Sequence, residues 1–543
     1  MNLDPASPMS RREKTPLSGK PAAAGSAADH PPLNAVDRAL FYLTASITGA
    51  TVMMIELLGT RIIGPFYGVN MIVWSSLLST ALFALSVGYL LGGRLADTAP
   101  RLRLSHILLL TGLLIGIIPL ISKPVQLATD GLGLRGGALS SALLLFAPCL
   151  VGLGMVGPYV IKITTRGIER VGRTAGTVYA ISTLGSVLGT LLLGFYLLPL
   201  FGTVSIVLSL SVLILVLAMA LATYEKFRLG AGLSLPLWGA ATAGLVAAVV
   251  FGVGGVAGKR DYPGSQVLFE EETAYGWVRV VDQPETGVRW LMSGGSTIGA
   301  EDLASGRGMF NYVQVAGLLP LFNQDAESAL LVGLGAGHLV NLYNRSGIVT
   351  DSIEIDPAVA RVASEYFSFQ GSGEVWVADA RYQIRKIDKQ YDFIIHDSFT
   401  GGSEPIHLLS REMFTELKAR LKPGGVMVLN MVGFTIEGER PSVEAVARTL
   451  DSVFPYRRSF VSEPTESFND FLFFVSDQPV VLDESPRFRE AVDWLLEREV
   501  MVAGDAGLLI TDDYNPLETL NIRKAEIYRK HLIERVGRDL LFH

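Results

Sequence analysis

A long apolar region in the first half of the chain constrains its fold most strongly. Between about Ala39 and Val256 the sequence is nearly all apolar, and it divides into stretches close to the ~20 residues that a helix needs to cross a bilayer. We count roughly seven such stretches, at 39–60, 71–93, 104–122, 139–161, 175–200, 203–223 and 234–257. The mean hydropathy of +0.39 over the whole chain is too high for a purely soluble enzyme. The sequence therefore predicts a helical transmembrane domain over residues 38–258.

Composition excludes several other classes of protein. The net charge of -7 provides no basic face for nucleic acid, so we expect no nucleic-acid partner. A single cysteine, Cys149, excludes a disulfide scaffold or a thiolate metal site within one chain. The seven histidines show no ligand spacing, and we expect no metal. Residues 1–37, rich in Pro, Ala, Ser and Gly, are predicted to be a disordered tail.

The second half of the chain has the pattern of a soluble α/β domain. Residues 276–282 and 288–292 flank a turn-forming segment and predict a hairpin, which belongs to a small β subdomain with a connecting helix over 263–320. Strands and helices then alternate through residues 321–543, which predicts a parallel, Rossmann-like sheet of the methyltransferase type. The expected strands are 328–332, 349–355, 374–377, 391–395 and 425–430, and 456–462 with 471–476 are expected to close the sheet as an antiparallel hairpin.

Glycines and acids follow the first three of these strands. Gly333, Gly335 and Gly337 allow a tight turn and a close approach of the backbone to a ligand. Glu354 ends the second strand, where a carboxylate can accept hydrogen bonds from both ribose hydroxyls, and Asp379 ends the third, within reach of an adenine amino group. Ligands of such sheets bind beyond the carboxyl ends of the strands. This order of residues predicts an adenosyl ligand of the S-adenosylmethionine type.

The chain resembles the spermidine synthase (polyamine aminopropyltransferase) family, in the form fused to a membrane domain. The resemblance covers about residues 263–480. It rests on Tyr312 with Leu319-Pro-Leu321, Gly333-Leu-Gly-Ala-Gly337, Ile353-Glu-Ile-Asp356, Val377-Ala-Asp-Ala380 and Tyr391-Asp-Phe-Ile-Ile-His-Asp397-Ser398. It implies that Glu354 holds the ribose and that Asp379, followed by Ala380, holds the adenine. It also implies that Asp397 is the catalytic base, that Tyr312 is a second catalytic residue, and that two chains pair as a homodimer.

The departures from that family concern the residues that grip a diamine. The acid of the glycine-rich loop is replaced by Ala336, and the second acid after Asp397 is replaced by Thr400. Glu404 and His407 follow in the same loop and, with Thr400, are the expected contacts of the acceptor. Loss of the acid at 336 would relieve repulsion against the carboxylate of intact S-adenosylmethionine. The cofactor is therefore expected to be S-adenosylmethionine or its decarboxylated form, and a polyamine substrate is in doubt.

Three functions remain open on these residues. The first is a membrane-integrated transferase that aminopropylates an amine or a membrane-proximal acceptor, with Asp397 as base. The second uses intact S-adenosylmethionine for methyl or 3-amino-3-carboxypropyl transfer, or cleaves it. In the third, a nucleoside-sensing domain gates the membrane half, where residues 88–97 resemble a loop of major-facilitator transporters.

Two arguments give opposite predictions for the side of the membrane on which the soluble domain lies. We expect a multi-pass protein of the inner, cytoplasmic membrane, and the cytosolic supply of adenosyl cofactors argues for a cytoplasmic soluble domain. The basic residues around the spans argue for the opposite side, because seven spans with the arginine-rich side inside place the soluble domain outside. That richer side carries Arg11, Arg12, Lys14, Lys20, Arg38, Arg94, Arg101, Arg103, Lys162, Arg166, Arg170, Arg173, Lys226 and Arg228.

Overall fold

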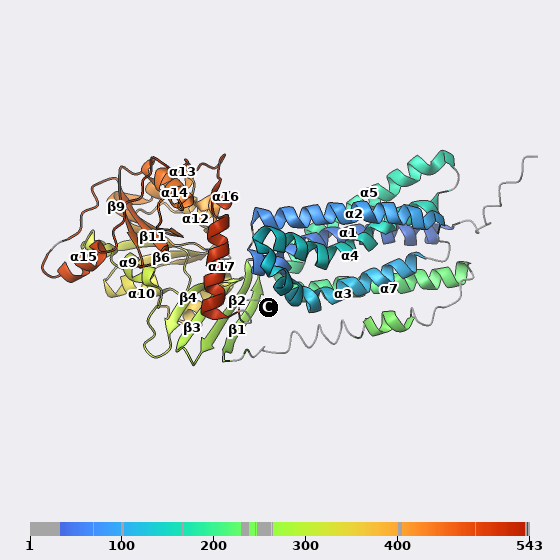
Figure 1. Ribbon diagram of the computed structural model, residues 1–543, viewed down its shortest axis with the longest axis horizontal. Coiled ribbons are helices and arrows are strands. Elements are labelled where there is room, and N and C mark those ends of the chain that lie inside the picture. The colour runs from blue at the N-terminus through green and yellow to red at the C-terminus, as the bar shows by residue number, and fades with distance from the viewer. Residues whose placement is uncertain are drawn as a thin grey trace, which may run out of the picture.

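Long helices form one end of the molecule, and a mixed α/β domain forms the other (Figure 1). The computed structural model describes residues 33–68, 70–98, 103–165, 168–229, 238–244, 246, 262, 264–399, 404–483, 485–537 and 540. The long helices are α1 (Ala35–Tyr67), α2 (Met71–Thr98), α3 (Leu104–Thr129), α4 (Gly133–Thr164), α5 (Val171–Leu192) and α7 (Thr203–Leu229). They coincide with the first six expected spans, and the expected span at 234–257 lies largely outside the described residues.

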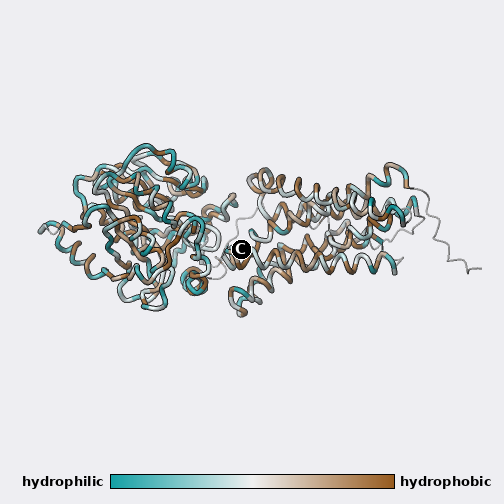
Figure 2. Tube along the Cα trace, turned by 90° about the horizontal axis from the view of Figure 1, so that it is seen from above, coloured by the Kyte–Doolittle hydropathy of each residue, from teal (hydrophilic) through white to brown (hydrophobic). Residues whose placement is uncertain are grey.

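The helical end has the composition of a membrane domain. Within the described residues, five helical segments are long and apolar enough to cross a membrane, and one of them, Leu104–Thr164, contains both α3 and α4. Figure 2 shows this end as predominantly hydrophobic, whereas the other end mixes hydrophilic and hydrophobic residues. Small residues bring the helices together, because a side chain at Gly185 or Gly189 of α5 would overlap Ser46 or Ala50 of α1. Gly194, one turn further, has open space around it.

Two sheets build the α/β domain. The small one is an antiparallel meander of β1 (Gln266–Thr273), β2 (Gly276–Gln283), β3 (Val288–Ser293) and β4 (Ser296–Asp302), which contains the expected hairpin. Helix α9 (Asn311–Ala316) leads from it to a seven-stranded sheet with the order β10-β11-β9-β8-β5-β6-β7. Its strands are β5 (Ser328–Val332), β6 (Val349–Glu354), β7 (Val375–Val377), β8 (Tyr391–His396), β9 (Leu421–Phe434), β10 (Tyr456–Val461) and β11 (Phe468–Ser476).

The large sheet is parallel where strands and helices alternate and antiparallel at its end. Strands β7, β6, β5, β8 and β9 pair in parallel, and β11 and β10 add antiparallel strands, as expected from the sequence. Its helices are α10 (His338–Arg345), α11 (Pro357–Tyr366), α12 (Ala380–Lys386), α13 (Arg411–Lys418) and α14 (Pro441–Asp451). Fully buried aliphatic and aromatic side chains cover both faces of the sheet, and its parallel strands with alternating helices give a Rossmann-like fold. Further helices α15 (Arg489–Leu496), α16 (Leu517–Leu520) and α17 (Ile522–Val536) follow β11.

Polar contacts join the helical bundle to the α/β domain. Arg61, near the end of α1, donates to the carbonyl oxygens of Thr273 (3.1 Å) and Ala274 in the β1–β2 turn. Glu272 of β1 accepts from the backbone N–H (2.7 Å) and the hydroxyl of Thr203, the first residue of α7. A carboxylate at a helix N-terminus satisfies free N–H groups and the helix dipole. The Arg61 side chain therefore joins the helical bundle to the α/β domain.

Helix α17 makes the other junction. The guanidinium of Arg529 lies 3.9 Å from the ring centre of Phe66 and 4.9 Å from that of Tyr67 at the end of α1. It also donates to Asp130 between α3 and α4 at 2.8 Å. Stacking on two rings and a partly buried ion pair act on the same side chain, so Arg529 holds α17 against the end of the bundle.

Replacing Arg529 by leucine is expected to weaken this junction by about 1–2 kcal/mol, the sum of a cation–π contact and a partly exposed ion pair. Hydrogen exchange of α17 should become faster, while exchange in β5 and β8 should stay unchanged. Lys530→Leu, at an exposed neighbouring position, is the matched control. Equal exchange of α17 in Arg529→Leu and in the unsubstituted chain would show that the junction does not depend on Arg529.

Candidate active site

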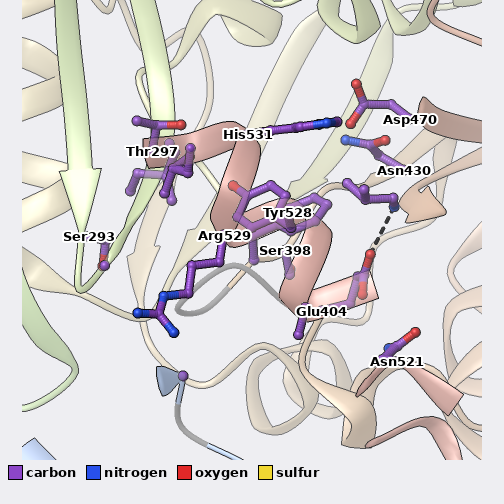
Figure 3. Close-up of a pocket in the computed structure, with 18 of the residues that line it drawn as sticks. Ser293, Thr297, Ser398, Glu404, Asn430, Asp470, Asn521, Tyr528, Arg529 and His531 are labelled. Carbon is purple, nitrogen blue, oxygen red and sulfur yellow. Dashed lines mark hydrogen bonds between the residues drawn. The ribbon is translucent and has the colours of Figure 1, made fainter. Parts of the chain in front are cut away.

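A large cleft lies between the carboxyl ends of the parallel strands and the end of the helical bundle. Its volume is about 2100 Å³. One wall comes from the strand ends and the small sheet, a second from α17, and the floor from the ends of α1, α2 and α4. Figure 3 shows side chains around this space from the small sheet, the large sheet and α17, among them Thr297, Asn430 and Tyr528. The cleft thus lies at the junction of the helical bundle and the α/β domain.

The glycine-rich turn after β5 forms part of this wall. Gly333, Gly335 and Gly337 have φ angles of 97°, 54° and 76°, in the left-handed region that glycine adopts without strain. A side chain at Gly333 would overlap the backbone carbonyl of Asp397, and one at Gly337 would overlap the ring of Phe369. Gly333 and Gly335 line the cleft, whereas Gly337 packs behind it as the N-cap of α10.

The two acids expected to hold the cofactor lie at the ends of β6 and β7. Glu354 is 8% exposed, and its carboxylate accepts the backbone N–H groups of Leu334 (3.1 Å) and Asp356 (2.9 Å). Burial raises the pKa of Glu354 in spite of these bonds. Asp379 is more exposed and caps α12 by accepting from the N–H of Tyr382 at 2.8 Å, with Ala380 as the first helical residue. Glu354, Asp379 and Ala380 all line the cleft, so the structure brings the expected cofactor residues together.

Asp397 follows β8 at the centre of the same edge. Asn430 of β9 donates to its carboxylate at 2.9 Å, and the hydroxyl of Tyr312 is a second hydrogen-bond donor. Desolvation outweighs these two bonds and raises the pKa of Asp397 to about 6. The same contact and the burial of the ring raise the pKa of Tyr312 well above its ordinary value, so Tyr312 stays protonated and remains a donor. Asp397 and Tyr312, each predicted as a catalytic residue, are in contact.

The residues predicted to contact the acceptor differ in their surroundings. Glu404 lines the cleft, but its carboxylate is 1% exposed, pairs with Lys524 of α17 and accepts the N–H of Val432 at 2.9 Å. Its charge is therefore already compensated within the protein. His407 lines the cleft near its rim and lies 3.6 Å from Asp379. Thr400 lies outside the described residues.

Two further residues of the expected site face the protein interior. Ala336 is 4% exposed and packs against Gly299 of β4, where a side chain on that glycine would come within 2.7 Å of the Ala336 methyl group. Position 336 is thus covered by the small sheet. The ring of His396 is buried, its Nε2 lies 3.1 Å from the carbonyl oxygen of Leu408, and burial lowers its pKa to about 4. His396 is therefore a neutral interior residue that packs at the end of β8.

Several cleft residues were not predicted from the sequence. The cleft is also lined by Asp470 of β11, Asn430 of β9 and, on α17, Tyr528 and His531 (Figure 3). Burial and the charge of Asp397 raise the pKa of Asp470 to about 6. The signal for Asp470 is an acid within an otherwise apolar strand, Phe468-Asn-Asp-Phe-Leu-Phe-Phe, and such a residue is seldom there for packing.

Comparisons with known proteins show which proteins the α/β domain is similar to. Residues 315–480 match the family model described as the spermine/spermidine synthase domain. An N-terminal histidine N-methyltransferase of Emericella nidulans is 30% identical over 222 residues, which are 36% of this chain and 39% of that protein. A polyamine aminopropyltransferase of Vibrio vulnificus is 42% identical over 132 residues, 22% of this chain and 43% of that protein. A probable polyamine aminopropyl transferase of Bifidobacterium longum is 26% identical over 290 residues, 48% of this chain and 64% of that protein. The chain thus spans less than two thirds of each of these relatives.

Proposed function

Because residues 315–480 are a spermine/spermidine synthase domain, we propose that this chain is a membrane-integrated transferase that alkylates an amine. The donor is a sulfonium of the S-adenosylmethionine type, and the principal candidate reaction is aminopropyl transfer from the decarboxylated form. Glu354 holds the ribose, Asp379 lies at the adenine end, and the acceptor enters from the membrane side of the cleft.

The observation that carries this proposal is the position of Asp397. Its carboxylate has a pKa raised to about 6, is oriented by Tyr312 and Asn430, and shares a cleft with Glu354. In the reaction, the acceptor nitrogen forms a bond to the carbon beside the sulfur, the carbon–sulfur bond breaks, and a neutral thioether nucleoside leaves. The nitrogen must lose a proton, and Asp397 accepts it. Tyr312 and Asn430 both donate to the carboxylate, so they keep its remaining lone pairs directed into the cleft.

The decisive experiment is equilibrium binding and turnover with both forms of the cofactor. The purified full-length protein is titrated with S-adenosylmethionine and with its decarboxylated form, and each complex is then incubated with putrescine. Tighter binding of the decarboxylated form, with aminopropylation of the amine, would support the principal candidate. Binding of neither form would contradict the whole proposal, and binding without any turnover would favour the nucleoside-sensing role.

A second candidate is methyl transfer from intact S-adenosylmethionine. The burial of Ala336 favours it, because position 336 holds neither an acid nor open space for one, and the ammonium of an aminopropyl group would lack that partner. The similarity to a protein named as an N-methyltransferase points the same way. The mass added to the acceptor separates methyl from aminopropyl and 3-amino-3-carboxypropyl transfer, and consumption of S-adenosylmethionine without an acceptor would indicate cleavage.

We also propose that the soluble domain lies on the non-cytoplasmic side of the membrane. The ion pair of Arg228 with Asp37 (2.8 Å) places the end of α7 beside the start of α1, and that of Lys162 with Asp97 places the ends of α4 and α2 together. This arginine- and lysine-rich end is the one far from the α/β domain (Figure 1). The positive-inside rule assigns it to the cytoplasm.

Cysteine labelling in intact cells tests this orientation. The natural Cys149 is fully buried, so it leaves a low background. Met501→Cys, at a position 92% exposed in the α/β domain, should react with a membrane-impermeant maleimide. The matched variant Val36→Cys, at a position 74% exposed at the opposite end, should react only after permeabilisation. The reverse pattern would place the domain in the cytoplasm, where the cofactor is supplied.

A further inference from the structure

Three residues with hydrogen-bond acceptors line the cleft side by side: Asp397, which directly follows β8, Asn430 of β9 and Asp470 of β11. We propose that Asp470, together with Asp397 and Asn430, forms a subsite for a cationic nitrogen of the acceptor, a protonated amine or imidazolium. This inference rests on the proposed function and adds the residue that selects a charged acceptor. Asp470 would take the place of the acid that the chain lacks at position 400.

The sheet register brings these side chains together. Strand β9 lies between β8 and β11. His396 pairs with Leu429, so Asp397 comes level with Asn430, and their 2.9 Å hydrogen bond confirms that they share a face. On the other side of β9, Asp470 pairs with Val432, two residues from Asn430, and residues two apart on a strand share a face. Asp470 is therefore the diagonal neighbour of Asn430.

Asn430 supplies an observation that points to a ligand. Its side chain is 3% exposed and lines the cleft, and its amide nitrogen donates to Asp397. Its carbonyl oxygen Oδ1 has no hydrogen-bond partner among the described residues. A buried amide oxygen left without a donor costs about 1–3 kcal/mol, so such an atom at a cleft wall is suited to an N–H group of a ligand.

The carboxylate of Asp470 is also incompletely compensated. Its recorded side-chain hydrogen bond comes from the hydroxyl of Ser462 at 3.1 Å, and within the described part of the chain no cation lies at ion-pair distance from it. Glu404, by contrast, is neutralised by Lys524. The charge of Asp397 makes Asp470 harder to ionise, and Arg535 acts on Asp470 only from a longer range. A ligand cation between the two carboxylates would relieve this repulsion.

The chemistry of the wall defines the class of ligand. Two carboxylates and an amide oxygen are all acceptors, so they match a group with several N–H donors and a positive charge. Aromatic rings complete this wall. The rings of Phe468 and His531 meet edge to face at 5.4 Å, and the hydroxyl of Tyr528 is bonded to Ser296 at 2.8 Å. The subsite therefore favours an amine or imidazole over an alcohol of the same shape.

The test measures binding and does not need an assigned reaction. The full-length protein is titrated with putrescine, histamine and n-butylamine, and with 1-butanol as the uncharged analogue, with and without 5′-methylthioadenosine. At least one amine should bind at least about tenfold more tightly than 1-butanol, as expected for charge-assisted hydrogen bonds. In Asp470→Asn this preference should fall at least tenfold, while affinity for 5′-methylthioadenosine stays within twofold.

Matched variants separate recognition from folding. Asp470→Glu keeps the charge and should retain part of the preference, whereas a purely structural role would not distinguish Glu from Asn. Asp493→Asn removes an exposed acid away from the cleft and should change nothing. Amine binding that is no tighter than 1-butanol, or is unchanged in Asp470→Asn, would overturn the subsite. Failure of 5′-methylthioadenosine to bind would instead count against the proposed function, and the amine titrations without nucleoside would still decide the subsite.

Discussion

Asp397→Asn is expected to lower kcat by about 10²–10⁴, the range for loss of a positioned general base. Asparagine keeps the size of the side chain and can still meet Asn430 and Tyr312, but it cannot accept the proton of the acceptor. Cofactor binding should change little, because Glu354 and the glycine turn lie on other strands. Rates under saturating cofactor and acceptor, with separate cofactor titrations, measure both quantities.

The same substitution should stabilise the protein at neutral pH. The folded-state pKa of Asp397 is raised from 3.8 to about 6, so ionisation at pH 8 opposes folding by about 3 kcal/mol. That cost is absent below the unfolded-state pKa, grows as the pH rises from the unfolded-state to the folded-state pKa, and is constant at higher pH. Asp397→Asn should therefore raise the melting temperature at pH 8 and have little effect near pH 4. A melting temperature that falls at pH 8 would show that the ionised carboxylate is not a buried, destabilising charge.

The pH profile gives an independent check on Asp397 as base. A base acts in its deprotonated form, so kcat/KM should rise with pH between about 5 and 7 and then level off. Tyr312→Phe tests this assignment, because the substitution removes a hydrogen bond that lowers the pKa of Asp397. In this variant the rise of kcat/KM should occur at higher pH. An unchanged profile in Tyr312→Phe would indicate that another group controls the rate.

Glu354→Gln is expected to weaken cofactor binding by about 10–100-fold, the equivalent of one or two hydrogen bonds to a charged group. The glutamate accepts two backbone N–H groups and lines the cleft, which leaves lone pairs for the ribose hydroxyls. Glutamine carries an amide NH2 group in place of one carboxylate oxygen, and this donor would face a backbone N–H group, which is also a donor. Calorimetric titration with S-adenosylmethionine, in both the intact and the decarboxylated forms, measures the effect.

Asp379→Asn is the control for Glu354→Gln. Asparagine can still cap α12, and the exposed Asp379 side chain has water as an alternative partner, so its loss should cost less than tenfold in affinity. Equal losses in the two variants would mean that Glu354 has no special role at the ribose. Unchanged binding in Glu354→Gln would remove the strongest argument for an adenosyl ligand.

The local pattern was sufficient for the parts of the site that follow directly from strand ends. Gly333, Glu354, Asp379 and Asp397 each come at the end of a recognisable parallel strand, and such ends meet at one edge whatever the rest of the fold does. The apolar lengths of the helices were equally readable, because hydrophobic thickness depends on composition alone. The junction of these helices with the α/β domain could not be predicted from the sequence, because Arg61 and Arg529 contact residues more than 200 positions away in the chain.

Sequence alone determined the two-part architecture, the sheet and the edge that carries the candidate cofactor residues, because these depend on hydrophobic period and on residues close together in the chain. Only the tertiary structure decided which side chains complete the cleft. The antiparallel register of β11 brings Asp470 beside Asn430, the small sheet covers Ala336, and Lys524 of α17 neutralises Glu404. Each of these contacts joins distant segments, and its geometry depends on packing between elements that no local pattern specifies.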